Sequence, residues 1–193
     1  MDQFFVYFET GFRHIADFKG IDHILFVLAL CIRYQFSDWK KLLILITAFT
    51  IGHSITLALS VFNVVNYSVA WIEFLIPVTI VITAISNLFV TKFTFKSKFP
   101  LIYFFALFFG LIHGLGFSNY LKSMLGKDET IIGELLAFNL GLEAGQIVIV
   151  LAILIISFIF VQLLKWNRRE FLLFVTGGVF AVALLMALER IPQ

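Results

Sequence analysis

Residues 131–164, IIGELLAFNLGLEAGQIVIVLAILIISFIFVQLL, form a long apolar run whose only charged residues are Glu134 and Glu143. About 20 consecutive apolar residues are enough for a helix to cross the hydrocarbon core of a bilayer. This run is longer than that, so we expect a membrane-spanning helix whose ends protrude or whose axis is tilted.

The composition of the whole chain agrees with a membrane protein. Hydrophobic residues make up 61% of the 193 residues and charged residues only 13%, and Phe alone occurs 25 times. A soluble domain is nearer half apolar and a quarter charged. Cys31, the single cysteine, excludes an intramolecular disulfide and a cysteine-based zinc site. We expect it to pack as a small apolar residue in a helix.

Apolar runs separated by charged residues predict an all-α, polytopic helix bundle with about six membrane spans. The predicted spans are 22–34, 41–62, 70–90, 100–117, 131–164 and 171–188. The first is short, and the stretch from Phe12 is expected to extend it as a tilted or broken helix. Short linkers and the absence of low-complexity segments predict one domain, 1–193.

The first residues of the chain do not resemble a signal peptide, since Asp2 and Glu9 precede Arg13 and no small-residue cleavage site follows. An amphipathic segment at the membrane interface is favoured over a frayed extension. Its aromatic residues are Phe4, Phe5, Tyr7, Phe8 and Phe12.

Basic residues predict the orientation of the spans. The loops after the first, third and fifth predicted spans hold nine Lys and Arg residues, against five on the other side. Because cytoplasmic loops carry the excess of positive charge, these loops are predicted to be cytoplasmic and both termini extracytoplasmic. The nine are Arg33, Lys40, Lys41, Lys92, Lys96, Lys98, Lys165, Arg168 and Arg169, and the five are Arg13, Lys19, Lys122, Lys127 and Arg190.

Every histidine of the chain lies in or beside an apolar run, and the four are His14, His23, His53 and His113. An ionisable residue inside a membrane is costly and indicates a functional site. The predicted orientation brings these histidines to one depth, in the outer half of the bundle. Acidic residues of similar depth are Asp22, Glu73 and Glu143. The pattern predicts a metal site with His23, His53, His113, Asp22, Glu143 and His14 as candidate ligands.

Polar residues at helical spacing predict a supporting shell for this site. Asn139, Glu143 and Gln146 share one helix face, and Thr50 and Ser54 lie near His53 in a similar stripe with Thr47. Glu73 joins the shell, although an interfacial position facing water is the favoured interpretation for it. Small residues let membrane helices approach closely. The glycines beside these positions are Gly52, Gly110, Gly114, Gly116, Gly141 and Gly145.

Asp22 and His23 are adjacent, so on a regular helix their side chains point about 100° apart. Either the helix is irregular near Gly20 and both coordinate one ion, or one binds the metal and the other orients it.

Four segments in order, GFRHIADFKGIDHILF, FTIGHSITLAL, FGLIHGLGF and FNLGLEAGQ, resemble the HupE/UreJ family of bacterial membrane proteins, in a divergent branch. The resemblance implies about six spans and nickel uptake. The family's motif of His, five residues and Asp-His implies roles for His14, Asp22 and His23, and a second signature implies one for His113. Here seven residues separate His14 from Asp22, so His14 is equally open to being a ligand or an interfacial residue.

Two functions remain open. One is binding and uptake of a divalent transition metal, nickel or zinc, although the inner halves of the spans are almost purely apolar, apart from Thr83, Ser86 and Asn87. The other is a metal-dependent hydrolase or transferase acting from outside on a lipid or membrane-anchored substrate, with catalytic residues unknown. Ser54 and Ser118 are possible nucleophiles, and Asp22 or Glu143 a possible general base.

Partners expected from the sequence are membrane lipids and a metal ion, and nucleic-acid binding has no support. The predicted location is the bacterial cytoplasmic (inner) membrane. Histidines can also form simple hydrogen bonds between helices, but the shared depth of His23, His53 and His113 argues against that interpretation for the three together.

Overall fold

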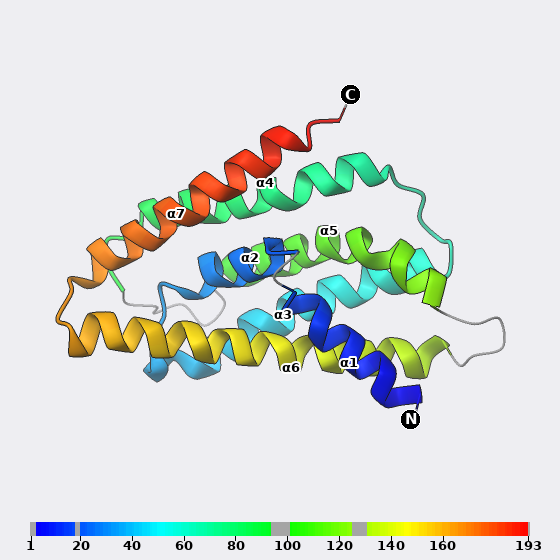
Figure 1. Cartoon of the computed structure of the whole chain (residues 1–193), viewed down its shortest axis with the longest axis horizontal. Helices are drawn as coiled ribbons and strands as arrows, with labels where there is room; N and C mark the ends of the chain where they lie inside the picture. The colour runs from blue at the N-terminus through cyan, green and yellow to red at the C-terminus, as the bar shows by residue number, and fades with distance from the viewer. Residues whose placement is uncertain (1–2, 18–19, 94–100, 125–130, 193) are drawn as a thin grey trace.

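The computed structural model describes residues 3–17, 20–93, 101–124 and 131–192, which form an all-helical bundle (Figure 1). Within these residues, five helices are long and apolar enough to cross a membrane. They are α3 (Trp39–Val61), α4 (Val69–Leu88), α5 (Leu101–Met124), α6 (Ile131–Phe158, continued by the π-helical turn η2, Ile159–Leu163) and α7 (Arg168–Glu189). In lipid only a helix satisfies its backbone hydrogen bonds within one segment. The predicted multi-pass helical membrane fold is confirmed.

The first predicted span, 22–34, corresponds to α2 (Asp22–Cys31), which is shorter than predicted. Ten residues rise only about 15 Å, half the hydrocarbon thickness. The preceding helix α1 (Gln3–Ile15) ends six residues before α2 begins, so the broken helix expected in this region is confirmed. Figure 1 shows α1 running obliquely from the N-terminal end of the molecule to its middle, and α2 continuing toward the opposite end.

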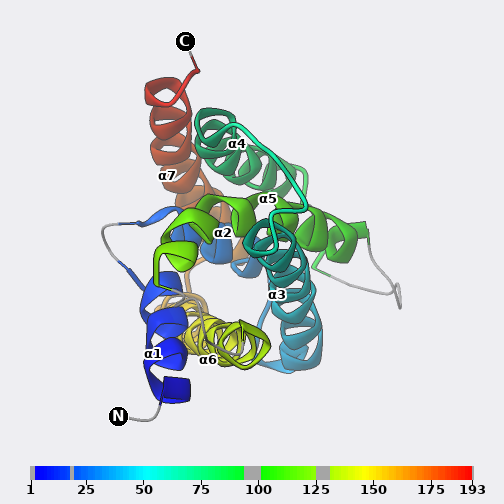
Figure 2. The same cartoon turned by 90° about the vertical axis from the view of Figure 1, so that its right-hand side faces the viewer.

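Helix α2 lies at the centre of the bundle, against α4, α6 and α7 (Figure 2). Around it, α3 packs on α5, α1 packs on α6, and α4 packs on α7. The central position explains why α2 is buried on nearly every side, including the fully buried Cys31, which packs as an apolar residue as expected.

Helix α5 extends to Met124, seven residues beyond the predicted end of the span at 117. The two serines in this extension fit a helix because their hydroxyl groups bond to backbone carbonyls of the same helix. Ser118 Oγ donates to the Leu115 carbonyl at 2.8 Å, and Ser123 Oγ donates to the Tyr120 carbonyl at 2.6 Å. Pro100, where the predicted span begins, lies outside the described residues.

Glycines bring two helix pairs into backbone contact, as expected. A Cβ atom added to Gly52 would meet the carbonyl oxygen of Leu107, and one added to Gly110 would meet that of Phe49, so α3 and α5 touch along their backbones. The α1–α6 pair is packed in the same way by Gly11 and Gly141, and Gly145 lies against the Ile15 side chain. These close crossings fix the positions of the helices that carry the histidines.

The loops form two groups, which lie at opposite ends of the bundle. The turns after α2, α4 and α6 lie at one end of the molecule, on the left in Figure 1, and the N terminus and the turn between α3 and α4 lie at the other. The basic residues of the first group that the structure describes therefore lie toward one end, and they are Arg33, Lys40, Lys41, Lys92, Lys165, Arg168 and Arg169. Four of the residues counted for orientation, Lys19, Lys96, Lys98 and Lys127, lie outside the described residues.

Candidate metal centre

The four histidines meet in the interior of the bundle although they come from four helices. The ring centroid of His23 lies 4.5 Å from that of His14, 5.2 Å from that of His113 and 6.4 Å from that of His53. His53 and His113 are fully buried, and His23 is nearly so. The four side chains, which come from separate helices, are therefore brought together by the fold.

Three of these histidines are close enough to share one ion. Among the described residues, the His, Cys, Asp and Glu side chains that could hold a metal together are His14, His23 and His53, with one nitrogen of each within 4.8 Å of the others. Buried polar atoms are almost always hydrogen-bonded. Here several buried ring nitrogens have no partner: His14 Nε2, His23 Nε2, both nitrogens of His53, and His113 Nδ1.

Asp22 fixes which nitrogen of His23 is free. Its Oδ1 accepts hydrogen bonds from the His23 backbone N–H at 2.9 Å and from His23 Nδ1 at 3.1 Å. A carboxylate can only accept, so Nδ1 carries the proton and the lone pair is on Nε2. Asp22 thus orients the ring of His23, as the second of the two predicted arrangements requires.

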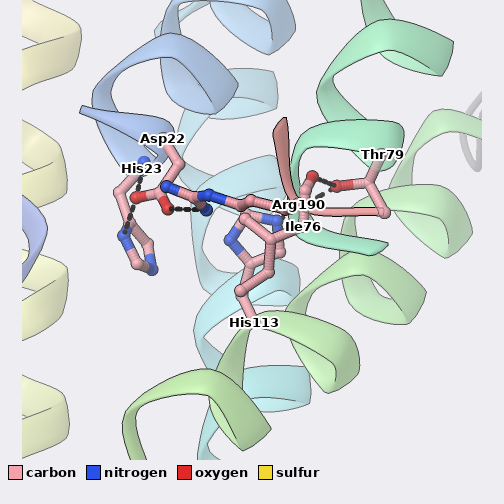
Figure 3. Close-up of polar contacts among 6 residues, drawn as sticks. All are labelled: Asp22, His23, Ile76, Thr79, His113 and Arg190. Carbon is pink, nitrogen blue, oxygen red and sulfur yellow. Dashed lines mark hydrogen bonds and ion pairs between the residues drawn. The ribbon is translucent and has the colours of Figure 1, made fainter. Parts of the chain in front are cut away.

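Thr79 on α4 does the same for His113. Its hydroxyl donates to the Ile76 carbonyl at 2.7 Å, and its Oγ1 lies 3.1 Å from His113 Nε2 (Figure 3). Since the hydroxyl proton is already used, Oγ1 accepts from Nε2–H, and the lone pair of His113 is on the unpaired Nδ1. The imidazoles of His23 and His113 are therefore each held in one tautomer.

Aromatic side chains surround the histidine cluster. Phe117 lies 3.8 Å from the ring centroid of His14, Phe138 stacks on His53 at 6.2 Å, and Phe26 lies 5.1 Å from His113. In such apolar surroundings an unpaired nitrogen is costly. A cation shared by the facing lone pairs would satisfy these nitrogens together.

A cavity of about 330 Å³ connects the cluster with the surface. Its wall includes both buried histidines and residues that are exposed to solvent, such as Glu73 on α4 and Asp17 after α1. The lining residues are His14, Asp17, Gly20, Asp22, His23, Glu73, Ile76, His113, Gly116, Phe117 and Arg190. Glu73 thus combines the exposure expected of an interfacial residue with a place in the wall of the site.

Glu143 does not belong to the three-histidine group. Its Oε1 accepts a hydrogen bond from Thr47 Oγ1 at 2.6 Å, and Gln146 Oε1 accepts one from Thr50 Oγ1 at 2.8 Å. These two pairs join α3 to α6 beside the cluster. Glu143, Gln146 and Thr50 are therefore placed as a polar continuation of the site.

The other predicted shell residues bond locally. Ser54 Oγ donates to the Thr50 carbonyl at 2.6 Å, and Asn139 Nδ2 donates to the Leu135 carbonyl at 2.8 Å, each one helical turn back. Ser118, the second candidate nucleophile, bonds to Leu115 and to Tyr67. Neither serine contacts a histidine in these bonds, so the geometry gives no support to a serine nucleophile.

Sequence reasoning missed two side chains of the site, Thr79 and Arg190. Thr79 lies four residues before Thr83 on a buried face of α4. Two threonines at this helical spacing in an apolar run indicate a polar stripe that faces the interior, and this signal was available in the sequence. Arg190 follows the last apolar run and had been counted only as a loop charge. Its Nη1 lies 3.4 Å from Asp22 Oδ2, an ion pair that joins residues 168 positions apart.

The donor set suits a borderline transition metal. Neutral imidazole nitrogens bind zinc, nickel, copper and iron, whereas oxygen-only sites suit magnesium and calcium. Ring orientation by a carboxylate is also typical of metal-bound histidine. The residues present therefore fit a divalent transition-metal ion.

A family model described as HupE / UreJ protein matches residues 1–190, nearly the whole chain. No curated protein and no solved structure matches the chain significantly.

Proposed function

This chain belongs to the HupE/UreJ family, and from that premise we propose that it takes up a divalent transition-metal ion of the nickel type across the membrane. His23 and His53 are the proposed principal ligands, with His14 and His113 completing the set. Asp22 is proposed to orient His23. Imidazole ligands suit nickel, cobalt and zinc alike, so the choice among them is left to the experiment below.

One observation carries the proposal: buried imidazole nitrogens from separate helices face one another without hydrogen-bond partners. Histidines that served only to join helices would use their nitrogens in hydrogen bonds. His53 uses neither of its two in the described structure.

Polar contacts that continue beyond the cluster support movement of the ion rather than storage. Thr47 precedes His53 by six residues, which is a rise of about 9 Å along α3. The hydrogen bonds Thr50–Gln146 and Thr47–Glu143 lie along this stretch. Glu143 offers a carboxylate for a cation that leaves the histidines. It thus supplies a polar group toward the inner halves of the spans, which the sequence shows to be almost purely apolar.

A second cavity supports an exit at the opposite end of the bundle. It measures about 220 Å³ and lies between the turn η1 (Phe36–Asp38) and the end of α6. Its polar lining residues are Gln35, Ser37, Ser157 and Gln162. We propose that this end faces the cytoplasm of a bacterial cell, because the basic loops lie there, and that both termini are extracytoplasmic.

The test combines binding and flux. The protein is purified without added metal and analysed for bound elements, and is then reconstituted in liposomes that contain a metal-sensitive dye. We expect Ni²⁺ or Co²⁺ entry in the unsubstituted protein, loss of binding in the His53→Ala, His113→Ala double variant, and loss of entry in His23→Ala. Gly178→Ala is the matched control, because its methyl group would meet no atom within 4 Å.

A metal-dependent hydrolase or transferase is the second candidate, and one cavity favours it. A hollow of about 940 Å³ adjoins His14 between α1 and α5, lined by Phe12, Arg13, Phe117 and Tyr120 among others. Its size and its largely apolar lining, which also holds Arg13 and Asp17, would suit a lipid substrate with a polar headgroup. The flux assay separates the candidates, since an enzyme would retain tightly bound zinc without moving it. If the protein neither binds nor moves a metal, both candidates fail.

A further inference from the structure

The cavity that leads to the histidines contains a cation of the protein itself. Arg190 immediately follows α7, and its Nη1 lies 3.4 Å from Asp22 Oδ2. Figure 3 shows its side chain reaching toward the carboxylate of Asp22. Both are at the wall of the same 330 Å³ cavity.

The fold fixes the point on the backbone from which this guanidinium extends. Helix α7 packs along α4 and also contacts α2, and the Arg190 backbone N–H donates to the Met186 carbonyl at 3.2 Å, which extends the last turn. The arginine is therefore attached to a helix anchored on both sides of the cavity. Because a guanidinium is never deprotonated in proteins, its charge is permanent.

Asp22 has both carboxylate oxygens engaged in this arrangement. Oδ1 accepts from His23, and Oδ2 pairs with Arg190. The negative charge that would attract an incoming divalent cation is thus already neutralised. A metal ion bound at His23 would share one cavity with the guanidinium, since both residues line it, and like charges in a poorly solvated site repel strongly.

We propose that Arg190 is a tethered competitor of the metal ion: it occupies the charge of Asp22 while the site is empty and must withdraw for the metal to bind. This inference rests on the proposed function. It makes Arg190 a residue that sets the affinity of the site and that favours divalent cations, since a monovalent cation gains too little to displace it.

A purely structural role for Arg190 predicts the opposite result. If the arginine only held Asp22 in place for His23, its removal would leave His23 less well oriented and metal binding would weaken. If it competes, its removal frees Oδ2 and abolishes the repulsion, and binding tightens. The sign of the change in affinity therefore decides between the two roles.

The experiment measures Co²⁺ affinity of the purified full-length protein in detergent, by competition with a chromophoric chelator. Arg190→Gln and Arg190→Met remove the charge, so that one uncharged variant remains if the other aggregates. Arg190→Lys keeps the charge, and Arg169→Gln removes an exposed arginine at the other end of α7. Elution of each variant as a single monodisperse species is the test of folding.

We expect each uncharged variant to bind Co²⁺ about tenfold more tightly, from the loss of the nearby positive charge. Arg190→Lys should stay closer to the unsubstituted protein, and Arg169→Gln should equal it. Unchanged or weaker binding in folded Arg190→Gln and Arg190→Met overturns the competitor role while leaving the proposed function intact. Absence of Co²⁺ binding in every protein overturns both.

Discussion

The close crossing of α1 and α6 gives a direct test of whether His14 is a ligand. In Gly141→Ala the new Cβ would meet the carbonyl oxygen of Phe8, and would lie 2.8 Å from the Phe8 carbonyl carbon and 3.0 Å from the Phe12 nitrogen. Ordinary contacts begin at 3.4 Å. The two helices must therefore separate by at least 3.4 − 2.8 = 0.6 Å, and by more to clear the oxygen.

This displacement is large for a metal site. His14 lies on α1 two residues after Phe12, so it moves with the helix. Metal–ligand distances are held within about 0.2 Å, so we expect His14 to move out of coordination distance. The affinity for Co²⁺ should then fall by about 10- to 100-fold, the loss that is typical when the residues supporting a metal ligand are changed. Chelator competition on purified protein measures the change, with His14→Ala alongside.

The control is Gly177→Ala on α7, where an added methyl group meets nothing within 4 Å. There the higher helix propensity of Ala is worth up to about 1 kcal/mol, so this variant should be at least as stable as the unsubstituted protein and bind Co²⁺ equally. If folded Gly141→Ala binds Co²⁺ with unchanged affinity, His14 is not a ligand and the reasoning from the crossing is refuted.

Three further predictions concern single hydrogen bonds. Thr79→Val removes the acceptor for His113 Nε2 and should weaken Co²⁺ binding about tenfold in the chelator assay; an unchanged affinity would remove His113 from the site. Glu143→Gln should leave Co²⁺ binding intact while slowing metal entry into liposomes, because Glu143 bonds to Thr47 and is not part of the three-histidine group; lost binding would instead make it a ligand. Asn87→Leu removes the hydrogen bond to the Ala29 carbonyl and should destabilise the fold by about 1 kcal/mol, measured by unfolding in mixed micelles; a variant as stable as the original would show that this bond does not anchor α2.

The sequence predicted the long helices because each follows from a local property, an uninterrupted apolar run. It also placed the four histidines at one depth, because depth follows from position along a span. The end of α5 was misplaced because Ser118 and Ser123 look like loop residues, and the backbone hydrogen bonds that make them compatible with a helix are not visible in composition.

The rotation of each helix about its axis was not predictable from one chain. Glu143 was expected beside the histidines because it lies at the right depth, but it points to Thr47 on α3. Arg190 was missed because its partner Asp22 is 168 residues away, and no local pattern connects them. Which helix faces contact one another depends on the packing of all the helices together. The sequence of a single span does not show which helices will be its neighbours.

The split between α1 and α2 also bears on how the protein is assembled. Both half-helices precede in the chain the helices on which they pack, since α1 rests on α6 and α2 is enclosed by α4, α6 and α7. With 13 and 10 residues, neither can be held across a bilayer by its own hydrophobicity. Their stable positions in the bundle therefore depend on helices that are synthesised later. The segment that supplies His14, Asp22 and His23 is translated before the helices that enclose it, so the histidine cluster can be complete only after those helices are in place.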